Sequence, residues 1–162
     1  ASAGEMTQPE LAGSAIGQGQ MLVSPLHMAL VAAAVANEGV IMKPYLVESV
    51  KDSAGFTGQR TVYHSWQKAF TPDIAGIIKE GMVGAVQYGT AQAAALPGIQ
   101  VAGKTGSAQN PQGPAHAWFI GFAPAVQPGL AVAVVLENAG SGGAVAAPIA
   151  GRLLAAAMSK GY

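Results

Sequence analysis

The chain contains no cysteine among its 162 residues. Disulfides, thiolate nucleophiles and thiolate metal sites are therefore excluded, while a reducing and an oxidising compartment both remain open. Charge is also scarce, because only 10% of the residues are charged and eight basic residues balance eight acidic ones. A neutral chain has no electrostatic reason to bind nucleic acid. We therefore expect no nucleic-acid partner.

Long hydrophobic runs are also missing. The longest apolar stretch, MLVSPLHMALVAAAVA at residues 21–36, is shorter than the roughly 20 residues that cross a bilayer, and it contains a proline and a histidine. It is typical of a buried helix. The first 20 residues show no obvious helix or strand pattern. We therefore expect the chain to begin midway through a larger protein.

The residues that are present predict one globular domain, or a large piece of one, because 51% are hydrophobic. Ser24 before Pro25 predicts a helix start, and Thr71 before Pro72 predicts a second helix over residues 72–88. Residues 40–50 and 60–66 are rich in β-branched and aromatic residues and predict a small group of strands. An alanine-rich segment beginning near Pro148 predicts a closing C-terminal helix.

Three apolar runs of strand length follow the second helix: IQVAGKTGSAQ, HAWFIGFAP and LAVAVVLEN, at residues 99–109, 116–124 and 130–138. The connections between them are short and rich in turn residues, which favours antiparallel hairpins. Trp118 and Phe119 are neighbours in one run, so they should face opposite sides, one toward the core and one toward a cleft wall. The predicted fold class is α+β, an antiparallel sheet with a three-stranded meander, packed by helices.

The string GIQVAGKT, from Gly98 to Thr105, fits the phosphate-loop pattern and raises the possibility of a nucleotide site. Such a loop must follow a strand and open a helix, so that helical N–H groups point at the phosphates. Here the residues inside the pattern resemble a strand, and Asn110, Pro111 and Gly113 oppose a helix downstream. The context argues strongly against nucleotide binding.

The end of the same string, Lys104, Thr105 and Gly106, favours a second interpretation, in which it lies on an edge strand beside a cleft. An ammonium group can hold a substrate carboxylate, a threonine hydroxyl can hydrogen-bond it, and glycine allows close approach. The triplet occurs in penicillin-binding proteins and class A β-lactamases. Three residues alone are weak evidence for that chemistry.

The wider sequence resembles the transpeptidase domain of class B penicillin-binding proteins, most closely the penicillin-binding protein A type of actinobacteria. KTGSAQ followed by HAWFIGFAP is similar to that family's KTGTA strand and its WF-x-G-x-x-P strand. AIGQGQMLVSPLHMALVAAAVANEGV resembles its GQG, Ser/Thr-Pro and NxG series, and GAVAAPIAGRLL resembles its closing helix. Order and spacing agree from about Ser14 to Met158, which identifies the chain as the C-terminal part of such a domain.

The resemblance implies roles for the residues at the matching positions. Lys104, Thr105 and Gly106 would lie beside an acyl-serine, and Lys104, Thr105 and Ser107 would bind the terminal carboxylate of a peptidoglycan stem peptide or a β-lactam. The Ser107 N–H would complete an oxyanion hole. Ser107 replaces the more usual threonine and keeps the hydroxyl. Gln18, in the GQG match, is expected to lie in a turn and to take no catalytic part.

Two of the family's three catalytic motifs are absent from the sequence. One serine–any–any–lysine string occurs, from Ser65 to Lys68, but it lies between a strand and the predicted helix cap, and much too close to Lys104 for the family's order. No serine–any–asparagine string occurs. The nucleophile is therefore expected in a missing N-terminal part of the same domain, and the 162-residue chain alone is expected to be inactive.

Several alternatives remain open at this point. The parent could be a D,D-carboxypeptidase or β-lactamase-like enzyme, or a non-catalytic β-lactam sensor or scaffold. The resemblance implies an extracytoplasmic location, through a membrane anchor outside this chain. His27, His64 and His116 lack a spacing suited to metal ligation, so we expect neither a metal nor a cofactor.

Overall fold

The computed structural model describes residues 6–19 and 21–161. The elements, in chain order, are α1 (Gln8–Ala15), α2 (Pro25–Ala36), β1 (Val40–Met42), β2 (Ser49–Lys51), β3 (Thr57–Arg60), β4 (Ser65–Lys68), α3 (Pro72–Gln87), η1 (Gln92–Ala94), β5 (Ala102–Asn110), β6 (Gly113–Ala123), β7 (Leu130–Leu136), η2 (Gly142–Ala146) and α4 (Ala147–Met158). The predicted α+β fold class, the three-stranded meander and the closing helix are confirmed.

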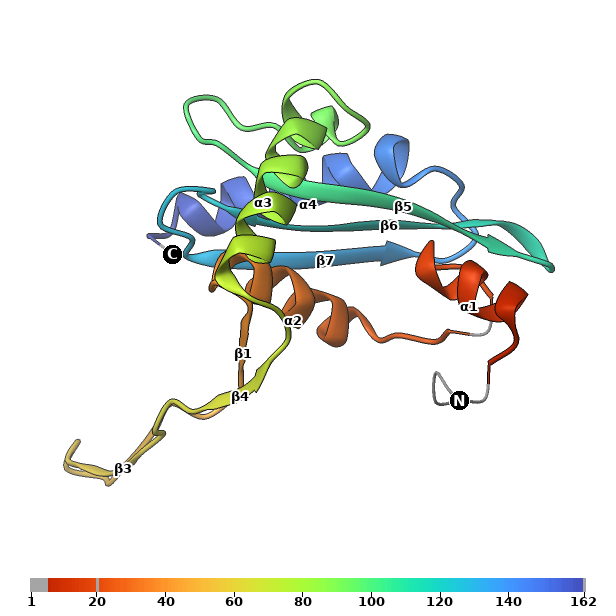
Figure 1. Ribbon diagram of the computed structural model, residues 1–162. Helices are drawn as coiled ribbons and strands as arrows, with labels where there is room; N and C mark the ends of the chain where they lie inside the picture. The colour runs from red at the N-terminus through yellow and green to blue at the C-terminus, as the bar shows by residue number, and fades with distance from the viewer. Residues whose placement is uncertain (1–5, 20, 162) are drawn as a thin grey trace.

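The central feature is an antiparallel sheet in the order β5-β6-β7, which leaves β5 at one edge. Helix α4 covers one face of this sheet, and α2 and α3 lie on the other side (Figure 1). The strands β5 and β6 are joined through only Pro111 and Gln112, since Asn110 pairs with Gly113. This connection is tighter than the turn expected at residues 110–115, and both strands are correspondingly longer.

The sheet carries an apolar cluster on each face. Phe119 and Phe122 are both fully buried, and they belong to different clusters because residues three apart in a strand face opposite sides. Phe119 packs with α4 residues such as Leu154, whereas Phe122 packs with Val35 of α2 and Met82 of α3. The sheet is therefore fixed from both sides, and its β5 edge is held in place.

The helix starts at Ser24 and Thr71 lie where the sequence predicts them. The Ser24 hydroxyl accepts a hydrogen bond of 3.1 Å from the His27 N–H, which caps α2. Asp73 occupies the first turn of α3, where its charge complements the helix dipole. Of the described residues, none forms a helix that combines the length and the apolar character needed to span a bilayer.

Helix α1 is a feature that the sequence analysis missed. The Thr7 N–H and the Thr7 hydroxyl both donate to the Glu10 carboxylate, at 2.8 Å and 2.7 Å. These bonds, the backbone one first, lower the pKa of Glu10 from its ordinary value. Thr-Gln-Pro-Glu at residues 7–10 has the form of a capping box with proline at the helix start, so a local signal was present.

The predicted strands between α2 and α3 form an arm, defined here as residues 40–70, that projects away from the sheet (Figure 1). It consists of two hairpin ladders, β1 with β4 and β2 with β3, instead of two long strands. Pro44, which has no N–H to donate to a ladder, lies between β1 and β2. Tyr45 and Tyr63 pack against each other at this break, with ring centroids 5.5 Å apart.

Replacing Phe119 by alanine should lower the free energy of unfolding by about 3–5 kcal/mol, because it would leave a cavity in the cluster beneath α4. Urea-induced unfolding would measure this loss. Phe56→Ala is the matched control, since Phe56 lies on the arm and is 74% exposed. Equal losses for both variants would contradict the assignment of Phe119 to the core.

Candidate active site

The residues from Lys104 to Ser107 lie in the middle of β5, on the open edge of the sheet. Lys104 and Gly106 pair with Ile120 and Trp118 of β6, whose side chains face the α2 side. Thr105 and Ser107 alternate with them and face the α4 side. A phosphate loop would need a helix after Lys104, but β5 continues to Asn110. The geometry therefore contradicts the nucleotide interpretation.

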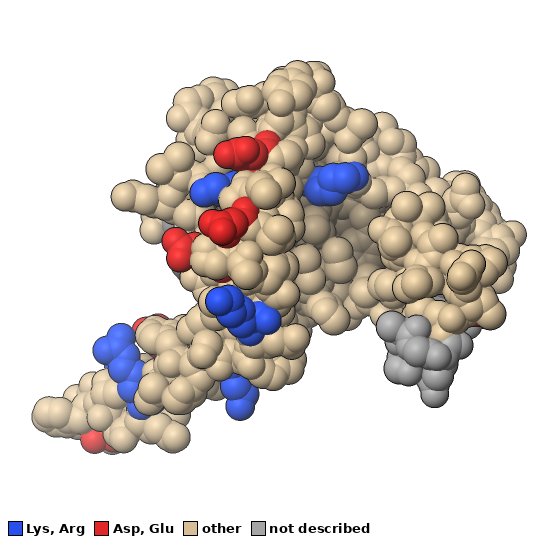
Figure 2. Space-filling view, viewed as in Figure 1, with Lys and Arg blue, Asp and Glu red and all other residues tan. Residues whose placement is uncertain are grey.

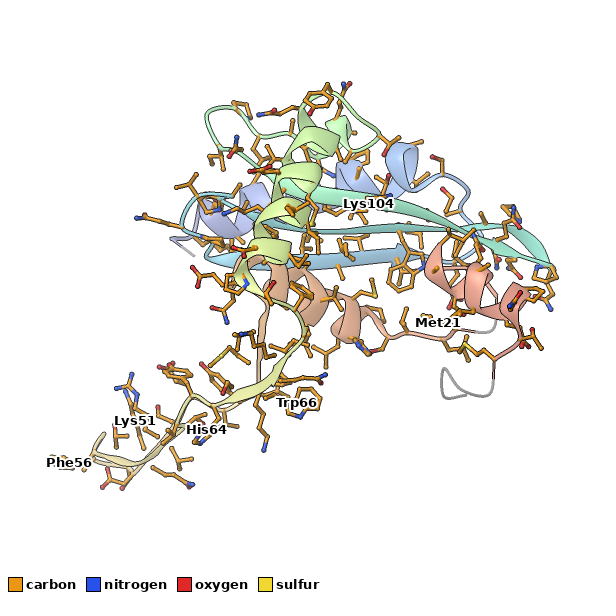
Figure 3. All side chains as sticks on the ribbon, viewed as in Figure 1. Met21, Lys51, Phe56, His64, Trp66 and Lys104 are labelled. Atoms are coloured by element: carbon orange, nitrogen blue, oxygen red, sulfur yellow. The ribbon has the colours of Figure 1, made fainter. Side chains whose placement is uncertain are left out.

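A cavity of about 460 Å³ lies against this strand. One wall is built from the β5 residues and Trp118, and the other from the chain between α1 and α2, including Gln18 and Met21. Figure 3 shows Lys104 and Met21 on the two sides of this space, and Figure 2 shows the surface hollowed there. Among the described residues that line the cavity, Lys104 alone is charged, so the cavity favours an anionic group.

Trp118 and Phe119 divide as predicted. Trp118 lines the cavity, whereas Phe119 is fully buried in the cluster under α4. Strand alternation accounts for the difference, because neighbouring side chains point to opposite faces. The cleft wall and the core are thus built from adjacent residues of one strand.

The hydroxyl groups of β5 already have protein partners. Thr105 is 8% exposed, and its Oγ1 lies 2.7 Å from the Thr90 Oγ1. The Ser107 Oγ accepts a hydrogen bond of 3.2 Å from the Gly142 N–H. A hydroxyl has one donor and two acceptor positions, so Ser107 keeps its own hydrogen to donate. The Lys104 Nζ donates to the Thr105 carbonyl and remains exposed to solvent.

Thr90 and Gly142 are contacts that sequence reasoning did not identify. A Cβ on Gly142 would lie 2.3 Å from the carbonyl oxygens of both Gly106 and Trp118. The backbone of η2 therefore packs directly against the β5–β6 ladder, with no room for a side chain between them. The run Gly-Ser-Gly-Gly at residues 140–143 was the available signal for this approach. Thr90 had no comparable signal, because its partner lies in a different element.

Gln18 also reaches β5 from a distant part of the chain. Its Nε2 donates to the Ser107 carbonyl at 3.3 Å, and its Oε1 accepts from the Gln109 N–H at 3.2 Å. The expectation that residues 17–19 form a turn agrees with the positive φ angles of Gly17 and Gly19. The direct contact with β5 was not foreseen.

The string from Ser65 to Lys68 forms β4 of the arm. Its lysine is therefore not one helical turn from its serine, which is the arrangement that would activate the hydroxyl. Figure 3 shows Trp66, inside this string, on the arm and well away from Lys104. The structure thus supports its interpretation as a chance match.

The histidines show no arrangement typical of a metal site. Within residues 6–19 and 21–161, no cluster of three or more His, Cys, Asp or Glu side chains could hold a metal ion. The His116 Nδ1 accepts a hydrogen bond of 3.0 Å from the Asn138 N–H. This bond links β6 to the turn after β7, which is a structural role.

The sequence matches the penicillin-binding protein transpeptidase domain family over residues 1–155. The chain belongs to this family. Among its relatives, the peptidoglycan D,D-transpeptidase PbpA of Mycolicibacterium smegmatis is 43% identical over 157 residues, which cover 91% of this chain and 32% of the relative. PbpA of Mycobacterium tuberculosis is 41% identical, covering 90% of this chain and 31% of the relative.

The fold of this transpeptidase-family chain is similar to solved structures. Penicillin-binding protein A from M. tuberculosis, in its ceftriaxone acyl-enzyme complex, aligns with a TM-score of 0.85 at 41% identity. The alignment covers 91% of this chain and 35% of that one. The chain therefore spans about a third of the length of the relatives it matches. The recognition of the family from its sequence motifs is confirmed.

Gly142→Ala should lower the free energy of unfolding by about 1–3 kcal/mol, because the added methyl group would collide with the Gly106 and Trp118 carbonyls. Gly81→Ala is the control, since a Cβ there meets nothing within 4 Å. Thermal or urea unfolding of both variants measures the difference. Gly81→Ala should stabilise its helix by up to about 1 kcal/mol, and a neutral Gly142→Ala would contradict the close approach.

Proposed function

We propose that this chain is the part of a peptidoglycan D,D-transpeptidase that supplies the lysine–threonine–glycine strand of the active site. The proposal depends above all on the position of Lys104. This charged residue lines the cleft, and it lies on β5 at the open edge of the sheet. The domain family and the acyl-enzyme complexes of its relatives support the same conclusion. The substrates are peptide stems of peptidoglycan, and β-lactams bind to the complete domain.

The cleft residues act on the charges of the substrate. The Lys104 ammonium attracts the terminal carboxylate of a stem peptide or the carboxylate of a β-lactam. The free hydrogen of the Ser107 hydroxyl can be donated to the same carboxylate. Of the two hydroxyl hydrogens of Thr105 and Thr90, one is used in the hydrogen bond between them and the other can be donated. Gly106 has no side chain to block the approach of the substrate to the strand.

The reaction needs a serine from the remainder of the domain. Its oxygen attacks the carbonyl carbon of the penultimate D-alanine, and the bond to the terminal D-alanine breaks as the departing nitrogen takes up a proton. An amine of a neighbouring stem then attacks the ester, loses a proton and releases the serine. Negative charge develops on the carbonyl oxygen in both steps, and we expect the Ser107 N–H to stabilise it.

The surface of this chain is suited to receive the remainder of the domain. Large apolar side chains are exposed from α1 to the start of α2: Leu11 at 51%, Ile16 at 78%, Leu22 at 96% and Leu26 at 60%. Large apolar side chains left exposed along one short segment are typical of a packing interface. The partner is the part of the same protein that carries the nucleophile, and the parent acts outside the cytoplasm through a membrane anchor beyond this chain.

Lys104→Ala in the complete protein should reduce the rate of acylation by a fluorescent penicillin about 100-fold or more, because an electrostatic contact with the ligand is lost. The unfolding transition should stay in place, since the Lys104 side chain is exposed. Lys68→Ala is the matched control and should be acylated like the unmodified protein. Normal acylation of Lys104→Ala, or a large loss in Lys68→Ala, would contradict the assigned site.

The isolated 162-residue chain should form no covalent adduct with fluorescent penicillin, because its one Ser-x-x-Lys string lies on β4 of the arm. Denaturing gel electrophoresis of the chain beside the complete protein, followed by intact mass measurement, would check this. A penicillin adduct on the isolated chain would show that the nucleophile lies within it. Absence of an adduct on the complete protein would favour a non-catalytic scaffold.

A further inference from the structure

Gln18 connects the N-terminal segment to the outer edge of β5. Its side-chain amide donates to the Ser107 carbonyl and accepts from the Gln109 N–H, so both of its polar atoms are bonded to one strand. The partners lie 89 and 91 residues away in sequence. Gln18 is half-buried, and it lines the cavity together with Lys104.

These bonds reveal which way the Ser107 backbone points. In an antiparallel sheet, opposite residues exchange both of their hydrogen bonds or neither, so the N–H and C=O of one residue face the same side. The Ser107 carbonyl faces Gln18, away from β6. The Ser107 N–H therefore also points away from β6, toward the open edge of the sheet, where a substrate carbonyl would lie.

The chemistry of the amide matches the two groups that it meets. Glutamine offers a donor group, its NH2, and an acceptor, its carbonyl oxygen, and the strand presents one acceptor at Ser107 and one donor at Gln109. Gly17 and Gly19 have φ angles of +73° and +91°, where residues with a side chain would be strained. A Cβ on either glycine would touch nothing within 4 Å. The positive φ angles, and not a lack of space, therefore account for glycine at these two positions.

We propose that Gln18 is a positioning residue for the oxyanion hole: it fixes the β5 backbone on the far side of Ser107, so that the Ser107 N–H keeps its direction during acylation. The proposal rests on the transpeptidase function proposed above. Because β5 is an edge strand of the described sheet, no neighbouring strand within residues 6–19 and 21–161 holds this side of Ser107. A donor aimed before the reaction stabilises the oxyanion without a reorganisation cost. Misplacement by about 1 Å can cost on the order of 100-fold in rate.

The test uses the complete protein and separates binding from chemistry. Gln18→Ala should lower the first-order rate constant of acylation by penicillin about 10- to 100-fold, because the oxyanion donor loses its fixed direction. The dissociation constant of the complex before acylation should change less than about threefold, because Lys104 is intact. A threefold change in this constant corresponds to less than about 1 kcal/mol. Gln112→Ala is the control, because its side chain makes no hydrogen bond among the described residues.

A second variant distinguishes positioning from packing. Gln18→Glu keeps the acceptor for the Gln109 N–H but, when ionised, places a second acceptor against the Ser107 carbonyl. A protonated carboxyl group can donate to that carbonyl. The acylation rate of Gln18→Glu relative to the unmodified protein should therefore rise as the pH falls from about 7 to about 5, toward the ordinary carboxyl range. A packing defect would not recover in this way.

The outcomes separate this inference from the proposed function. If the unmodified protein is acylated and Gln18→Ala is acylated at the same rate, the inference about Gln18 is overturned and the proposed function is not. A faster rate in Gln18→Ala would also overturn it, since Gln18 would then compete with the substrate for the Ser107 carbonyl. No acylation of the unmodified protein would overturn the proposed function and this inference together. A slow Gln18→Ala without pH recovery in Gln18→Glu would reduce Gln18 to a packing role.

Discussion

The position of β5 at the edge of the sheet is the constraint on which the rest of the site depends. An edge strand presents backbone groups that no neighbouring strand satisfies, and a transpeptidase can use such groups to hold a substrate or an oxyanion. An open edge also needs support, because no strand of the described sheet pairs with its outer side. Support comes from both faces of the sheet, where Phe119 and Phe122 pack into separate clusters. Gly142 brings η2 close to the same ladder.

Much of this arrangement could be predicted from the sequence, because its signals are local. The alternation of apolar residues predicted the meander, and the opposite orientation of Trp118 and Phe119 followed from strand geometry alone. The caps at Ser24 and Thr71 placed the starts of α2 and α3. Lys104 was assigned to the candidate site because a short motif and its neighbours agreed in type and order with one family. Membership of the transpeptidase family is confirmed, and the role of Lys104 stays a prediction.

The remaining features were not predicted from the sequence, for two different reasons. Helix α1 and the break in the arm at Pro44 had local signals, a capping box and a proline, that were overlooked. Gln18 and Thr90 had no such signal, because each is defined by a partner in a separate element. Side-chain alternation could assign faces to Thr105 and Ser107, but it could not show that Thr90 and Gly142 already bond their hydroxyl groups.

The bonds that Gln18 makes to the edge of β5 also have a consequence for solubility. Exposed strand edges template pairing with other chains, and long flat edges are sites of aggregation. On β5, Gln18 takes the Ser107 carbonyl and the Gln109 N–H, and the Lys104 ammonium bonds the Thr105 carbonyl. These bonds occupy backbone groups of the β5 edge that would otherwise be open to pairing with a foreign strand. The same amide that borders the cleft therefore also protects the sheet from edge-to-edge association.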